Sequence, residues 1–131
     1  MDSDGVSPLT TPDVLDLATA SGVWAIRSES TAVYYLDLPG LVMRARGPSS
    51  QSFPFDDEWV RLVEVISFDP MTGESAANQI RTGWRPRYLT DPRGGAHDYE
   101  WRLQRTVTTI EQVAPDAART LRGLHRPRDD D

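Results

Sequence analysis

Arginines and aromatic residues are interleaved between residues 81 and 105, where their types best suit contact with an anionic or macromolecular partner. The segment holds six arginines against three acids, with two tryptophans and two tyrosines among them. Guanidinium groups beside aromatic rings are typical of surfaces for single-stranded nucleic acid, and Trp, Tyr and Arg also anchor protein interfaces. The run "GWRPRY" does not alternate as a strand does. We therefore take as the candidate contact surface Trp84, Arg85, Arg87 and Tyr88.

The second aromatic run, "YEWRL", alternates apolar and polar residues as a half-buried strand does. This period favours a position in the core for Tyr99 and Trp101, with the arginines on the solvated face. The two runs thus receive different interpretations, although both lie in the same Arg-rich segment.

Carboxylates offer the main route to catalysis, because the chain has no cysteine and only two histidines. Glu64 is the one acid within an otherwise apolar strand face, and burial there would raise its pKa and suit it to carry a proton. An acid at such a position more often lies at a sheet margin or pairs with an arginine. The loop from Asp91 to Glu100 gathers acids around His97, but a transition-metal site typically needs more ligands at defined spacing. A small carboxylate-dependent enzyme is therefore the last alternative, and we expect no metal site.

Recognised catalytic and cofactor motifs are absent. The sequence lacks G-x-S-x-G, the P-loop, the dinucleotide-binding glycine pattern and H-E-x-x-H. The glycines of "RGGAHD" lack the preceding strand and following helix of a phosphate-binding loop, so they predict a hairpin turn. We expect no catalytic residue and no cofactor.

The formal charge of −6 is concentrated at the two ends of the 131-residue chain. Residues 21–128 hold thirteen acids against all fourteen arginines, so the body is close to neutral. A protein that mimics DNA needs negative charge on its folded surface, and this distribution counts against that class.

The elements that position these residues are mostly strands. Period-two alternation predicts strands over 23–28, 31–38, 41–46, 58–68 and 99–113, with an irregularity near 106–109, and a further, ambiguous strand over 76–89. Both faces of 58–68 are largely apolar, which favours a central strand covered on both sides. Capping residues predict short helices over 11–22 and 115–126. The fold class is mainly β: a small antiparallel sheet of six or seven strands, rolled into a partial barrel or sandwich, with short N- and C-terminal helices.

The length predicts one domain over residues 1–131, with disordered tails at 1–10 and 126–131. The acidic, polar start does not resemble a signal peptide, and no apolar run could cross a bilayer. Together with the absence of cysteine, these features predict a soluble, cytoplasmic protein with no membrane contact.

The stretch "VWAIRSESTAVYYLDLPGLVMRARG", residues 23–47, resembles a pattern of small uncharacterised β-rich proteins of actinobacteria and their phages. Its parts are a Trp-containing strand, a Ser/Thr-rich turn, an aromatic strand ending in Leu-Asp-Leu and a return strand. A fainter similarity lies in "WRLQRTVTTIE". The resemblance implies a β-rich fold and assigns no activity or site.

These observations predict a non-enzymatic interaction module that binds a protein partner, as an accessory or regulatory factor of phage or actinobacterial origin. Binding of nucleic acid through residues 81–105 is the first alternative, and it would show a steep salt dependence. Exposed sheet edges can also pair with a second copy of the chain, which leaves a homodimer open.

Overall fold

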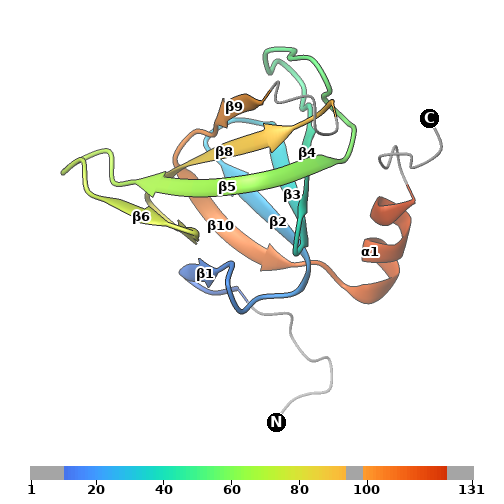
Figure 1. Ribbon diagram of the computed structural model, residues 1–131, viewed down its shortest axis with the longest axis horizontal. Coiled ribbons are helices and arrows are strands. Elements are labelled where there is room, and N and C mark those ends of the chain that lie inside the picture. Colours follow the sequence, from blue (N-terminus) through green and yellow to red (C-terminus); the bar gives the residue numbers. More distant parts are fainter. Residues whose placement is uncertain (1–10, 94–98, 124–131) are drawn as a thin grey trace, which may run out of the picture.

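The computed structural model describes residues 11–93 and 99–123, and its main feature is an antiparallel eight-stranded sheet (Figure 1). In spatial order its strands are β10 (Val107–Gln112), β2 (Gly22–Ser28), β3 (Val33–Leu38), β4 (Leu41–Ala45), β5 (Val60–Phe68), β8 (Arg85–Asp91) and β9 (Glu100–Leu103), with β6 (Ser75–Ala77) also paired to β5. A two-stranded sheet joins β1 (Val14–Asp16) to β7 (Gln79–Arg81). The mainly β prediction is confirmed.

The large sheet is rolled but not closed into a barrel. Its two ends, β9 and β10, are consecutive in the chain and are joined by residues 104–106. This link stays close to β8, because the amide of Gln104 donates to the Pro86 carbonyl and that of Val107 donates to the Trp84 carbonyl, each over 2.9 Å. The register of β10 against β2 shifts between Val107 and Thr109, so the predicted irregularity is confirmed.

The hydrophobic core lies inside the rolled sheet, and alternate residues of the strands contribute their side chains to it. Its fully or nearly buried members are Leu15, Trp24, Ile26, Tyr34, Leu36, Leu38, Val42, Val65, Ile80, Tyr88, Val107 and Ile110. The rings of Tyr34 and Tyr88 stack with centroids 4.6 Å apart. The Tyr88 hydroxyl donates to Gln104 Oε1 over 2.7 Å, and Gln104 Nε2 donates to the Ile26 carbonyl over 2.8 Å. A buried polar chain therefore ties β8 and the link between β9 and β10 to β2.

The C-terminal helix α1 (Pro115–Arg122) confirms the second predicted helix, with proline in its first turn. It packs against the outer side of the sheet, at the right of Figure 1. The indole of Trp59 donates to the Leu121 carbonyl over 2.7 Å, and Arg122 lies 3.2 Å from Asp37 of β3. Ala118 is the buried residue of its inner face. Among the residues described, no helix is long and apolar enough to cross a membrane.

The predicted helix over 11–22 is wrong, because its centre forms strand β1. Leu15 is buried opposite Ile80 of β7, and the residues on either side of Leu15 are exposed. Only a turn follows, where the amide of Ala18 donates to Asp16 Oδ1 over 3.0 Å. Capping residues at its start could not outweigh the pairing of β1 with β7.

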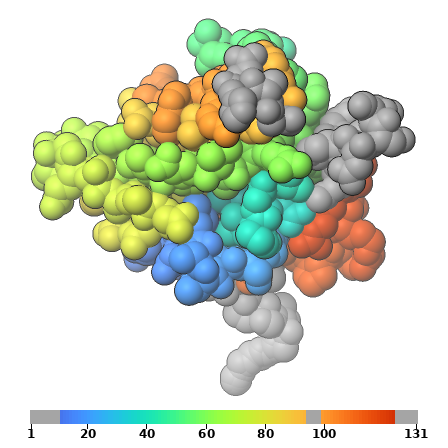
Figure 2. Space-filling view, viewed as in Figure 1, coloured from blue at the N-terminus to red at the C-terminus, as the bar shows by residue number. Residues whose placement is uncertain are grey.

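Strand β5 is not covered on both faces, which corrects the prediction of a doubly buried strand. It lies between β4 and β8, but Val63 is 47% exposed and Glu64 is exposed as well. A register shift against β8 between Leu62 and Glu64 inserts Val63 as an extra residue. Beyond β5, the turn that leads to β6 projects from the body at the left of Figure 2, with Met71 88% exposed.

Because of two buried tyrosines, the stability of the folded protein should depend on pH in the alkaline range. Burial raises the pKa of Tyr34 and raises that of Tyr88 well above the ordinary value. Above about pH 10 the unfolded chain releases these phenolic protons while the folded chain keeps them, so the free energy of unfolding should fall as pH rises further. We expect Tyr88→Phe to flatten this fall in chemical denaturation series at increasing pH. An unchanged slope would contradict the assignment.

Candidate functional site

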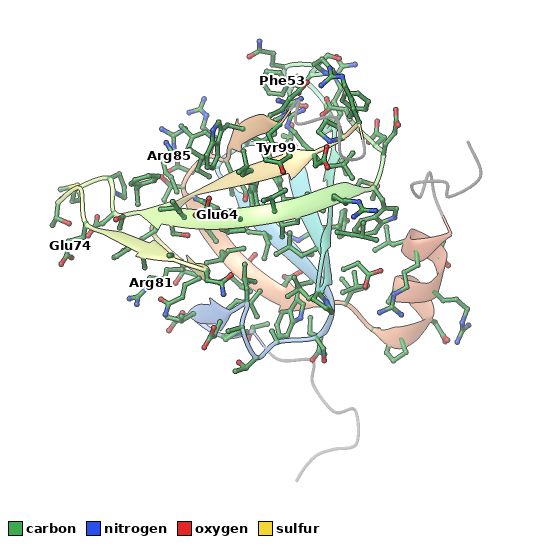
Figure 3. All side chains as sticks on the ribbon, viewed as in Figure 1. Phe53, Glu64, Glu74, Arg81, Arg85 and Tyr99 are labelled. Carbon is green, nitrogen blue, oxygen red and sulfur yellow. The ribbon has the colours of Figure 1, made fainter. Side chains whose placement is uncertain are left out.

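The outer surface of the last two strands of the sheet carries the largest group of exposed aromatic and apolar side chains on the described chain. We call it the β8–β9 face and define it by Arg85, Arg87, Tyr99, Trp101 and Leu103. Cross-strand register places Leu103 opposite Arg87, and Trp101 opposite Leu89. Figure 3 labels Arg85, at the start of β8, and Tyr99, which directly precedes β9.

The apolar members of this face are open to solvent. The exposed fractions are 46% for Tyr99, 44% for Trp101 and 51% for Leu103. The residues between them in β9 are half-buried, so the strand alternates with the apolar side chains outward. Single exposed apolar residues are ordinary on a protein surface, whereas large contiguous apolar patches are typical of interaction sites.

Arg87 lies at the centre of the β8–β9 face, between two aromatic rings. Its guanidinium carbon is 4.3 Å from the ring centroid of Trp101 and 5.1 Å from that of Phe68 on the neighbouring strand β5. The Nε atom of Arg87 is buried, with no hydrogen-bond partner among the described residues, and no described carboxylate forms an ion pair with this side chain. The stacking fixes the guanidinium in place while its charge stays uncompensated.

Other arginines of the segment are engaged within the protein. Arg81 donates two hydrogen bonds to Gln79 Oε1, over 3.0 and 2.8 Å. Arg93 and Arg102 both pair with Glu100, over 2.9 and 2.8 Å. Burial acts to raise the pKa of Glu100, but the hydrogen bonds from these two guanidinium groups outweigh it and lower the pKa. These three arginines therefore serve local structure.

The four residues of the predicted contact surface lie in three different environments. Arg85 and Arg87 are on the β8–β9 face. Trp84 directly precedes β8 in the chain and is half-buried. The guanidinium carbon of Arg81 lies 4.8 Å from its ring centroid. Tyr88 is fully buried and stacked on Tyr34, so it is a core residue that no partner could reach. The run "GWRPRY" is a regular strand from Arg85 onward, with Pro86 and Tyr88 inward and the arginines outward.

The core position predicted for Tyr99 and Trp101 is wrong. Alternation correctly separates the two faces of β9, but it does not say which face meets the core. The inner face of β9 carries Glu100 and Arg102, which are half-buried and paired with each other, while the aromatic face is open. The sequence does carry one signal for this orientation. Glu100 lies among several arginines, so an ion pair can form there and occupy the inner face of β9.

The described acid–base candidates lie in different environments. Glu64 is exposed on β5, which removes the burial that was expected to tune it (Figure 3). Asp91 is buried at the end of β8, and Glu100 is held by Arg93 and Arg102. His97 lies outside the described residues. Within residues 11–93 and 99–123, no group of three metal-binding side chains comes together.

Comparison with known proteins gives no match to any protein-family model, to any curated protein or to any solved structure.

Proposed function

We propose that this protein is a non-enzymatic interaction module that binds a second protein through the β8–β9 face. The single observation that carries the proposal is the exposed row of Tyr99, Trp101 and Leu103 beside the stacked, uncompensated Arg87. Aromatic residues and arginine supply most of the binding energy in protein interfaces when partners cover them. The preferred partner is an extended segment that presents apolar side chains beside a carboxylate.

The position of β9 supports a strand-like partner. In the described chain β9 is the last strand of the sheet and pairs with β8 alone. An edge strand offers unpaired backbone groups, and an extended peptide can add to it while its side chains contact the adjoining face. Leu103, at the end of β9, gives such a segment an aliphatic contact.

Charge complementarity supports an acidic group on the partner. The guanidinium groups of Arg85 and Arg87 have no carboxylate partner among the described residues, and Arg85 Nε donates only to the Gln104 carbonyl, over 3.0 Å. A planar guanidinium binds a carboxylate with two parallel hydrogen bonds. An acid next to an apolar anchor would therefore satisfy both parts of the face.

Nucleic acid fits this face less well. Single-stranded nucleic acid needs a series of available cations along its backbone and open ring faces for its bases. Three of the six arginines between residues 81 and 105 are engaged internally, and Arg87 stacks on the ring of Trp101. Nuclease treatment and an oligonucleotide titration distinguish this alternative.

Photo-crosslinking tests the proposed function directly. A photoreactive aromatic amino acid at position 101 should crosslink one protein in nuclease-treated cell lysate, and mass spectrometry should place the crosslink in an extended, acidic and apolar segment. The purified partner should then bind Trp101→Ala about 30-fold more weakly than wild type, as expected for a hot spot worth about 2 kcal/mol. Met71→Ala is the matched control, because Met71 is an exposed apolar residue away from the face.

Other crosslinking outcomes would contradict a protein partner of this kind. A crosslink to a second copy of the chain would show a homodimer, while recovery that disappears with nuclease would favour nucleic acid. Equal binding by wild type and Trp101→Ala would remove the β8–β9 face from the interface. A cytoplasmic setting belongs to the same proposal and is consistent with a chain that has no cysteine.

A further inference from the structure

A polar cavity of about 400 Å³ opens at one end of the rolled sheet and adjoins the β8–β9 face, with which it shares Arg85 and Leu103. Three segments surround it: the turn between β2 and β3, the loop between β4 and β5, and the link between β9 and β10 with the start of β8. Tyr34 of the core and Gln104 of the buried polar chain also line it. The mouths of rolled sheets and barrels are common places for small-molecule sites, and this volume lies within their usual range.

The charges around the cavity are all of one sign. Its lining contains Arg44, Arg85 and Arg105, and no aspartate or glutamate. The charge of Arg44 is compensated, because its Nη1 lies 2.6 Å from Asp56 Oδ2. Arg85 and Arg105 have no carboxylate partner among the described residues. The cavity therefore carries a positive potential to which two guanidinium groups contribute most.

Hydroxyl groups add donors to the same wall. Ser28 Oγ accepts from the amide of Ser30 over 3.2 Å, and Ser30 Oγ accepts from the amide of Ala32 over 3.1 Å. Each oxygen therefore serves as an acceptor, and neither hydroxyl donates to another described residue. A serine hydroxyl has one proton to donate, so both remain available to an acceptor inside the cavity.

We propose that this cavity is a binding site for a small, polar phosphate-bearing molecule such as a sugar phosphate. The guanidinium groups of Arg85 and Arg105 bind the phosphate oxygens, and the hydroxyls of Ser28 and Ser30 donate to the ligand. The cavity holds much more than a phosphate ion, and its serine- and glutamine-rich wall suits the hydroxyl groups of a sugar. The donors come from segments distant in sequence and surround one cavity. This arrangement suits a small ligand better than a nucleic-acid strand, which needs cations spaced along its backbone.

Calorimetric titration of the full chain with glucose 6-phosphate, inorganic phosphate and glucose tests this site. We expect saturable binding of glucose 6-phosphate, weaker binding of inorganic phosphate and no binding of glucose. Arg105→Ala should weaken binding of the sugar phosphate about tenfold or more, as expected for a charge-assisted hydrogen bond. Arg105 is exposed with no partner among the described residues, so this variant should fold. Arg85→Ala/Arg105→Ala should abolish measurable binding.

Control variants distinguish specific binding in the cavity from non-specific attraction of an anion to the positive charge of the protein. Arg61→Ala/Arg119→Ala removes the same net charge from exposed positions outside the cavity and should leave binding unchanged. Amide chemical shifts should move at Ser28, Ser30 and Gln104 as ligand is added. No binding to wild type, equal loss in the control pair, or tighter binding of a single-stranded oligonucleotide through the same arginines would each overturn the proposal. Trp101 does not line the cavity and Arg105 is not part of the β8–β9 face, so Trp101→Ala and Arg105→Ala test the two proposals separately.

Discussion

Tyr88→Ala should lower the free energy of unfolding by about 4 kcal/mol, the range seen when a large buried aromatic residue is truncated. The ring is fully buried and stacks on Tyr34. Its hydroxyl also satisfies Gln104 Oε1, which would be left as a buried acceptor without a partner. For a small domain of marginal stability, a loss of this size approaches complete unfolding.

Denaturant titration of three variants checks the assignment of Tyr88 to the core. Tyr88→Phe keeps the ring and should lose about 1–3 kcal/mol through the unpaired acceptor. Trp101→Ala, in the same part of the sheet, should lose only about 1 kcal/mol, since it removes a half-exposed ring and one stacked guanidinium. If Tyr88→Ala and Trp101→Ala had the same free energy of unfolding, Tyr88 would lie on the surface, where the sequence analysis placed it, and the core assignment would be wrong.

The contrast between Tyr88 and Trp101 shows what the sequence can and cannot determine. Period-two alternation is a local property, so it predicts most of the strands and separates the two faces of each one. Which face turns inward depends on how the sheet rolls, a property of all strands together. Tyr88 and Trp101 lie on opposite faces of adjacent strands, and local alternation does not determine which of those faces the roll buries.

The N-terminal segment illustrates a second limit. Thr11, Pro12 and Asp13 have the residue types of a helix start, and that local preference is worth about 1 kcal/mol. Pairing of β1 with β7 buries Leu15 against residues more than sixty positions away, which no local pattern encodes. By contrast, α1 forms where predicted, because its first-turn proline and acid act where no strand competes.

The candidate sites show the same contrast between local sequence patterns and long-range packing. The sequence indicated residues 81–105 as the candidate segment because its composition is unusual, and this segment contributes all of the residues that define the β8–β9 face. It could not show that Glu100 engages two arginines and leaves others without a carboxylate partner among the described residues, since that depends on how β8 pairs with β9. Nor could it show the cavity, whose serines and arginines come from three segments that only the roll brings together.

Gly47→Ala should destabilise the protein by about 3 kcal/mol, near the upper end for an added methyl group in a packed position. A Cβ atom at Gly47 would lie 2.2 Å from the carbonyl oxygen of Thr31 and 2.4 Å from its carbon. Both are backbone atoms, so a side-chain rotation cannot relieve the clash. The Thr31 hydroxyl also donates to the Pro48 carbonyl, which fastens the turn between β2 and β3 to the loop after β4.

The same substitution should separate two walls of the polar cavity. Ser28 ends β2 and Ser30 lies in the turn that holds Thr31, while Ser50 lies in the loop after β4 that contains Gly47. Gly47→Ala should therefore lower both the thermal midpoint and the affinity for glucose 6-phosphate. Gly123→Ala is the control, because the nearest atom to its added Cβ, the Thr120 carbonyl oxygen, is 3.5 Å away. A Gly47→Ala protein with wild-type stability would mean that these two segments do not approach closely in solution, and the cavity wall would lose its structural basis.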